Sequence, residues 1–172
     1  MLSAALVVFI LLVPLTFAYG AWRAAPWVPS LRSTVDRFLP LAHIHPGQTV
    51  VDLGCGDGKL LAAVVAQGGI AIGFEIALLP YLIAKIRGRI LPEAQRQRYF
   101  VYYKDFWSAD LSSADVVFAY LLPRVHQRLR KKLETSLKPG TRVIISTWPI
   151  IGWRPSVIDT RPGQIKLYSY QR

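Results

Sequence analysis

The densest group of chemically capable residues lies between positions 52 and 59, where acidic side chains alternate with glycines. The segment reads Asp52-Leu53-Gly54-Cys55-Gly56-Asp57-Gly58-Lys59 and follows an apolar, β-branched run. Glycines allow a backbone to turn sharply and to approach a ligand closely. The segment therefore predicts a ligand-binding loop at the carboxyl end of a strand, where open α/β sheets bind small molecules.

The charge of this loop indicates the kind of ligand. A dinucleotide-binding fingerprint has its third glycine where this chain has Lys59. Asp52 and Asp57 would repel a pyrophosphate, but they suit a ligand with a cationic amino group and no phosphate. The loop thus favours S-adenosylmethionine over a nicotinamide dinucleotide as the cofactor. The cofactor-binding candidates in it are Asp52, Gly54, Gly56 and Asp57.

Two further acids follow the next two predicted strands. Glu75 lies about 20 residues beyond the loop, where an acid can hydrogen-bond ribose hydroxyls. Asp105 follows the third strand, where a carboxylate can accept from an adenine amino group and Phe106 or Trp107 can flank the ring. Each acid alone could be only a turn former or an N-cap. Because the three acids end successive strands, we expect them to bind one cofactor together.

The periodicity of the chain supplies the elements that would position these residues. Apolar or β-branched runs predict strands at residues 49–53, 70–75, 99–103, 115–120, 141–147, 156–160 and 164–170. Helical spacing predicts helices at residues 33–41, 59–67, 78–90 and 125–137. This alternation predicts a doubly wound, mostly parallel seven-stranded α/β sheet, and the last two strands are expected to form a hairpin.

The N-terminal segment predicts a transmembrane anchor. Residues 2–22 contain no charged side chain, and a helix needs roughly 20 residues to cross the hydrocarbon core. Arg23, Arg32 and Arg37 follow and, by the positive-inside rule, would keep the catalytic domain of a single-pass protein in the cytoplasm. The alternatives are a cleaved signal peptide, although no Lys or Arg precedes the apolar run, and a buried core helix.

Composition and net charge indicate which classes of binding partner this chain could have. Of the 172 residues, 52 % are hydrophobic, which excludes a disordered chain, and the formal net charge is +11. A basic surface favours lipid headgroups, nucleic acid or an acidic protein, or serves only solubility and topology. We expect no nucleic acid as partner, because no base-recognition module is evident. We also expect no metal, because no Cys or acid cluster completes a site around His43 and His45.

One predicted helix concentrates positive charge. Its basic residues are Arg124, Arg128, Arg130, Lys131 and Lys132. They could face anionic lipid headgroups, at about 1 kcal/mol per charge close to the surface, or form a solvated helix face. His126 lies on the same helix, and we expect it at the surface.

The motif Asp-x-Gly-x-Gly-x-Gly with a later strand-end Glu resembles the class I, seven-β-strand methyltransferases. The resemblance in element order runs from about residue 48 to the C-terminus. It implies S-adenosylmethionine as cofactor. We accordingly divide the chain into an anchor at residues 2–22, a linker at 23–47 and a methyltransferase domain at 48–172.

A narrower resemblance is carried by short segments in a fixed order. After the apolar segment come Pro26-Trp27-Val28-Pro29-Ser30, the glycine loop, Gly73-Phe74-Glu75, Asp105-Phe106-Trp107, and residues 143–149 with Trp153. This order is similar to that of small membrane-anchored protein-lysine methyltransferases that modify the ATP synthase c subunit and the adenine nucleotide carrier. That family usually has Arg where this chain has Lys59. The resemblance implies a lysine of a membrane protein as methyl acceptor.

Methyl transfer to nitrogen is an in-line displacement at an activated sulfonium, so the protein mainly positions the reactants and desolvates the amine. Tyr120, after the fourth strand, is the candidate catalytic residue. Trp27, Trp148 and Trp153 are candidates for an apolar channel that receives an alkylamine, although each could equally be a packing residue. The alternative functions are a lipid or quinone methyltransferase and a non-catalytic cofactor-binding scaffold.

Overall fold

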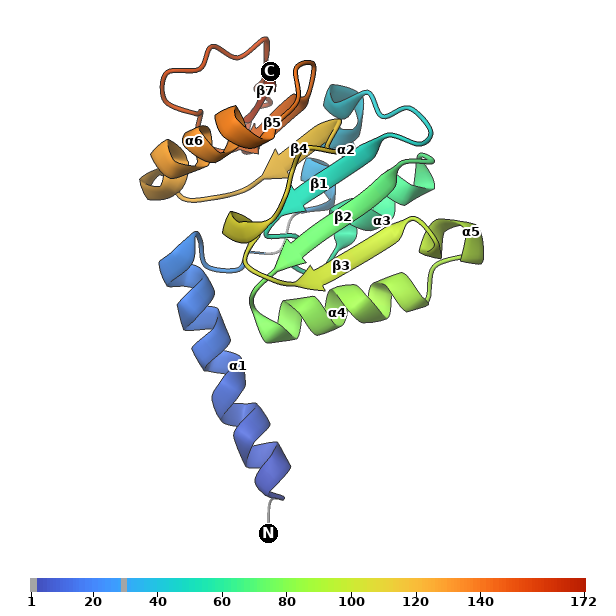
Figure 1. Cartoon of the computed structure of the whole chain (residues 1–172), viewed down its shortest axis with the longest axis vertical. Coiled ribbons are helices and arrows are strands. Elements are labelled where there is room, and N and C mark those ends of the chain that lie inside the picture. The colour runs from blue at the N-terminus through green and yellow to red at the C-terminus, as the bar shows by residue number, and fades with distance from the viewer. Residues whose placement is uncertain (1–2, 29–30) are drawn as a thin grey trace.

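The computed structural model describes residues 3–28 and 31–172, so Leu2 of the expected anchor and Pro29 and Ser30 lie outside the described residues. The described strands form one sheet in the order β3-β2-β1-β4-β5-β7-β6 (Figure 1). They are β1 (Thr49–Leu53), β2 (Ile70–Glu75), β3 (Tyr99–Tyr103), β4 (Val116–Ala119), β5 (Arg142–Ser146), β6 (Val157–Asp159) and β7 (Leu167–Gln171).

The helices agree with the sequence periodicity to within a few residues. They are α1 (Ala4–Arg23), α2 (Arg32–Ala42), α3 (Lys59–Ala66), α4 (Leu78–Arg89), α5 (Glu93–Arg96) and α6 (His126–Ser136), with short 3-10 turns at η1 (Phe106–Ser108) and η2 (Pro123–Val125). The sequence did not predict α5 and η1, because a single turn has no hydrophobic period to detect.

The sheet confirms the mostly parallel, doubly wound fold. Strands β1, β2, β3, β4 and β5 pair in parallel, whereas β7 runs antiparallel between β5 and β6. The expected hairpin is therefore β6–β7. Since β1 lies at the centre between β2 and β4, its carboxyl end, with Asp52, faces the crevice at which the strand order reverses.

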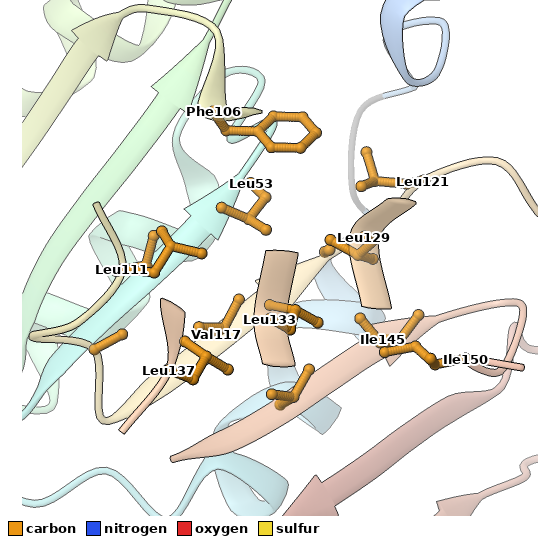
Figure 2. Packing of buried hydrophobic residues seen from close by; sticks show 14 of the residues in the cluster. Leu53, Phe106, Leu111, Val117, Leu121, Leu129, Leu133, Leu137, Ile145 and Ile150 are labelled. Carbon is orange, nitrogen blue, oxygen red and sulfur yellow. The ribbon is translucent and has the colours of Figure 1, made fainter. Parts of the chain in front are cut away.

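Both faces of the central strands are buried, as expected for parallel strands. Along β4, Val117 packs into the cluster beneath α6, and its neighbour Phe118 packs into the cluster beneath α2 and α3. Figure 2 shows the first of these clusters, with Leu129 and Leu133 of α6 lying over the sheet. Alternate side chains thus explain why these strands are continuous apolar runs.

The segment at 23–47, expected as a linker, contributes to the same core. Phe38 of α2 is fully buried and contacts Phe118 edge-on, with 5.2 Å between ring centroids. Arg37, only 2 % exposed, donates four hydrogen bonds to the β6–β7 hairpin. Helix α2 therefore ties the hairpin to the sheet. The domain boundary between residues 47 and 48 stays a prediction.

Helix α1 projects from the domain (Figure 1). Its window Leu6–Arg23 has a mean hydropathy of 1.8 and is 6 % buried, so by length and composition it could cross a membrane. The end of α1 nevertheless packs on the domain, because Thr16 Oγ1 accepts a hydrogen bond of 3.1 Å from Leu78 N. A Cβ on Gly20 would come within 3.2 Å of Ile76. The helix is thus exposed in its first part and docked in its last turns.

Candidate functional site

The glycine loop is held across the end of β2. Gly54 and Cys55 both donate backbone N–H bonds of 3.0 Å to the carbonyl oxygen of Phe74. Gly54 has a φ of +89° and Gly56 a φ of +55°, which side chains rarely adopt. A Cβ on Gly54 would meet no atom within 4 Å. The loop therefore presents bare backbone to open space, as close approach of a ligand requires.

The Glu75 carboxylate ties this loop to the start of α4. One oxygen accepts from Gly56 N at 2.8 Å, and the other accepts from Ile76 N at 2.8 Å and Ala77 N at 2.7 Å. Burial raises the pKa of Glu75, while the backbone hydrogen bonds act in the opposite direction. Because a carboxylate offers about four acceptor positions, one remains for a ligand hydroxyl.

A pocket opens at this crevice and gathers most of the expected site residues. It is lined by Asp52, Gly54, Gly56, Asp57, Glu75, Asp105, Phe106, Tyr120, Trp27 and Trp148. The carboxyl ends of β1, β2, β3 and β4, the turn after β5 and, for Trp27, the segment after α1 bring them together. Their individual roles stay predictions.

Asp52 places a buried carboxylate beside the loop. Its residue is 3 % exposed. Burial raises its pKa well above the ordinary value, and the nearby carboxylates of Glu75 and Asp57 raise it further. A bound cation would favour the ionised form of Asp52. The pocket therefore suits a cationic ligand, and the sulfonium and ammonium groups of S-adenosylmethionine meet this requirement.

Asp57 is oriented by two cations. Its Oδ2 accepts from Arg87 Nη2 at 3.0 Å and lies 3.3 Å from Lys59 Nζ. Arg87 Nε also donates to the Asp57 carbonyl oxygen at 2.7 Å. Arg87 of α4 thus turns inward, because Asp57 is its partner. Asp57 thus holds the loop against α4 as well as lining the pocket.

Asp105 caps η1 and is paired with α1. Its Oδ1 accepts from Trp107 N at 3.1 Å, and its Oδ2 accepts from Arg23 Nε at 3.0 Å. Phe106 is buried and packs against Trp107, with 4.6 Å between ring centroids. Of these two aromatic residues, Phe106 lines the pocket. Sequence reasoning missed Arg23 as a site residue, because nothing local links it to a strand end.

The segment after α1 forms a wall of the pocket. Trp27 packs against Phe17, with 5.9 Å between ring centroids. A Cβ on Gly56 would lie 2.7 Å from Trp27 Nε1, so this glycine gives room to the indole. The indole nitrogen is buried and finds no hydrogen-bond partner within residues 3–28 and 31–172. An unsatisfied donor at the loop fits a ligand that carries a carboxylate.

Tyr120 and Trp148 form the other side of the pocket. Their rings are nearly parallel, with centroids 6.4 Å apart and planes at 30°. The residue before Trp148, Thr147, has a φ of +73°. A β-branched residue in this conformation is strained, and such strain is concentrated at functional sites.

Trp153 does not line the pocket. Its Nε1 donates to Glu134 Oε1 at 3.0 Å, and its ring packs edge-on against Tyr170 at 5.6 Å. It is half-buried between α6 and β7 and packs against the core, where Glu134 accepts its N–H. Trp153 therefore belongs to packing rather than to the channel suggested by the sequence.

The basic helix is largely engaged within the protein. Arg128 stacks over the Trp107 ring at 4.1 Å, and Lys132 donates to the carbonyl oxygens of Trp107 and Ala109. The expectation that His126 is at the surface was wrong. This residue is 1 % exposed, since both ring nitrogens lie 3.1 Å from carbonyl oxygens of the loops after β4 and β5.

Comparison with known proteins agrees with the fold. Residues 52–157 match the family model described as the ANTKMT methyltransferase domain. A protein-lysine N-methyltransferase of Saccharolobus islandicus is 32 % identical over 81 % of this chain and 88 % of its own length. A Xenopus laevis enzyme named as a lysine N-methyltransferase of the ATP synthase c subunit is 32 % identical over 77 % of this chain, which spans only 58 % of that relative.

A solved structure supports the cofactor. The crystal structure of an RNA methyltransferase from Salinibacter ruber in complex with S-adenosyl-L-homocysteine has a TM-score of 0.77 and 32 % identity. The match covers 84 % of this chain and 93 % of that one. The cofactor of this chain is S-adenosylmethionine, and the chain belongs to the ANTKMT methyltransferase domain family of class I S-adenosylmethionine-dependent methyltransferases.

Proposed function

We propose that this chain is a membrane-anchored protein-lysine methyltransferase that acts on a lysine of a membrane protein. The observation that carries the proposal is that the pocket wall is built by the end of α1, through Phe17, Gly20 and Arg23. An acceptor held in a membrane beside α1 would therefore lie close to the pocket. Relatives named for methylation of the ATP synthase c subunit and of the adenine nucleotide translocase support the same acceptor class.

The cofactor side of the site is assigned to the glycine loop and the strand-end acids. S-adenosylmethionine, when bound, supplies a methyl group on a positively charged sulfur. Asp52 and Glu75 would stabilise this charge and hold the ribose, while Gly54 and Gly56 leave space for the ligand. Asp57 would fix the loop and bound cofactor, and Asp105 and Phe106 would hold the adenine.

The acceptor side is assigned to the aromatic residues. Tyr120 and Trp148 would enclose the aliphatic part of a lysine side chain and exclude water from its amine. The Tyr120 hydroxyl would accept a hydrogen bond from the amine and so orient its lone pair. Trp27, beside the loop, would close the pocket where cofactor and acceptor meet.

The anchor is assigned to residues 2–22, with one crossing and the domain in the cytoplasm. The apolar window Leu6–Arg23 and the arginines that follow it support this topology. Because Thr16, Gly20 and Arg23 contact the domain, a truncation that tests attachment should end before Thr16. Deletion of residues 1–15 is then expected to release the protein from membranes and to leave cofactor binding intact.

Methyl transfer from labelled S-adenosylmethionine to a host membrane fraction tests the function. Protease-sensitive label that is recovered on lysine supports the proposal. Label that extracts into organic solvent indicates a lipid or quinone enzyme, and nuclease-sensitive label indicates RNA, the substrate class named for the Salinibacter structure. Intact cofactor binding without any transfer indicates a scaffold. An Asp52→Asn variant serves as the control for transfer through this pocket.

A further inference from the structure

Helix α4 carries an exposed apolar ridge. Leu79 is 37 % exposed, Ile86 is 58 % exposed, and Ile90, which caps the helix, is 78 % exposed. Leu82 and Ile83, between them, are only half-buried. The opposite side of the helix packs on the sheet through small buried residues, Ala84 among them. A contiguous apolar ridge on a helix surface marks an interaction site.

The charges on this helix have one sign. Lys85 and Arg89 are exposed beside the ridge, and Arg87 turns inward to Asp57. The helix sequence, LLPYLIAKIRGR, contains no acidic residue. An apolar ridge bordered by cations is typical of helices that lie in the interface of an anionic membrane. It fits an anionic surface better than a basic protein partner, since the helix itself offers cations and no carboxylate.

The position of α4 agrees with this interpretation. Its first residue donates a backbone hydrogen bond to Thr16 of α1, so the ridge begins where the exposed apolar part of α1 leaves the domain. In Figure 1, α4 runs along the edge of the domain from which α1 projects. A groove between α1 and the end of β3 is lined by Tyr19, Tyr103 and Lys104, among others. Tyrosine and lysine are favoured at the membrane interface.

We propose that the outer face of α4 (Leu79, Leu82, Ile83, Lys85, Ile86, Arg89 and Ile90) lies on an anionic lipid bilayer and forms a second membrane contact beside α1. This inference rests on the proposed membrane anchoring by α1. Its consequence is that the domain does not swing freely on its anchor. Two contacts hold the pocket at a fixed height above the lipid, beside an acceptor held in the same membrane.

Site-specific fluorescence in the full chain tests the contact. Leu11→Cys in α1, Ile86→Cys in α4 and Lys131→Cys in α6 are labelled with an environment-sensitive dye, while the native Cys55 is buried. Leu11, Ile86 and Lys131 are all exposed. Each protein is reconstituted into vesicles of phosphatidylcholine and phosphatidylglycerol with or without brominated acyl chains. We expect brominated chains to quench the dyes at positions 11 and 86, but not the dye at position 131.

The remaining outcomes separate the two proposals. Quenching at position 11 without quenching at position 86 overturns the α4 contact and leaves the anchor standing. No quenching at either position overturns both. A blue-shifted dye at position 86 that brominated lipid does not quench indicates a protein or a second copy of the chain on this face, and also overturns the lipid assignment.

The charge dependence provides a second readout. In the Ile86→Cys protein, Lys85→Gln and Arg89→Gln should each lower the ratio of lipid-bound to free α4 by about fivefold. Gln127→Ala on α6 is the matched surface control. Quenching at position 86 that does not change with these substitutions or with the phosphatidylglycerol content would contradict recognition of anionic lipid.

Discussion

Arg23, the last residue of α1, forms an ion pair with Asp105, which lies 82 residues later in the chain and follows β3. The pair joins the end of an apolar helix to the expected adenine side of the cofactor pocket. Arg124 strengthens the junction by donating to the carbonyl oxygen of Ala21. The N-terminal helix is therefore a wall of the site as well as a candidate anchor.

This junction predicts that Arg23→Ala weakens binding of S-adenosylmethionine, because Asp105 loses the partner that orients it. The pair is partly exposed, so the loss should be about fivefold or less in Kd. Calorimetric titration of the full chain in detergent measures it. Arg32→Ala, at an exposed position on α2, is the control. Coupling in a double-mutant cycle with Asp105→Asn is expected, whereas additive effects would show that the pair does not act through Asp105.

Asp52 is expected to be needed for binding and costly for stability. Its pKa in the folded protein is raised above the ordinary 3.8. Folding therefore favours the neutral, protonated carboxyl group of Asp52. The stability that this protonation contributes is fully present below pH 3.8 and is lost as the pH rises through the raised pKa. At neutral pH Asp52→Asn should raise the Tm and at the same time weaken S-adenosylmethionine binding.

Thermal melts across this pH range and calorimetric titration test both effects. As the pH rises above 3.8, the Tm of the Asp52→Asn variant should fall less than the Tm of the parent protein. Asp36→Asn, at an exposed position on α2, is the control and should change neither quantity. Unchanged cofactor affinity in Asp52→Asn would remove this residue from the site.

Tyr120 is predicted to act on the acceptor and not on the cofactor. Tyr120→Phe keeps the ring against Trp148 but removes the hydroxyl, so kcat should fall about 100-fold while the Kd for S-adenosylmethionine stays unchanged. Steady-state rates over a range of pH, with titration of the cofactor, separate the two. Tyr102→Phe, on an exposed strand position, is the control. An unchanged kcat would leave Tyr120 with a packing role.

The acids at the strand ends could be predicted from the sequence. The hydrophobic pattern predicts the strands, and the position of each acid along the chain puts it at the end of one. Each predicted strand was located to within a few residues, and Asp52, Glu75 and Asp105 all line one pocket. These residues belong to elements whose apolar runs are visible in the sequence itself.

Contacts between distant segments could not be predicted in this way. Two ion pairs depend on how helices pack against the domain, namely Arg23 with Asp105 and Arg87 with Asp57. No local sequence pattern predicts this packing. Trp153 and His126 were misjudged for the same reason, since their burial is decided by partners on other elements. Residue type alone does not separate a pocket aromatic from a core aromatic.

The last prediction concerns Arg37, which is buried between α2 and the β6–β7 hairpin. Its guanidinium donates to Asp159 Oδ2 at 3.0 Å, to Gln164 Oε1 at 3.1 Å and to the carbonyl oxygens of Ile165 and Asp159. Arg37→Met keeps the apolar volume but leaves these acceptors without a donor, so the free energy of unfolding should fall by about 3 kcal/mol.

Thermal unfolding should show this loss as a Tm lower by about 10 °C. Arg37→Lys should not restore stability, because an ammonium cannot reproduce the planar fork of donors. Arg32→Met, exposed on the same helix, is the control. Since the hairpin lies away from the pocket, the folded fraction of Arg37→Met should bind S-adenosylmethionine with unchanged Kd. A variant as stable as the parent would mean that the hairpin is held to the sheet by β7 pairing alone.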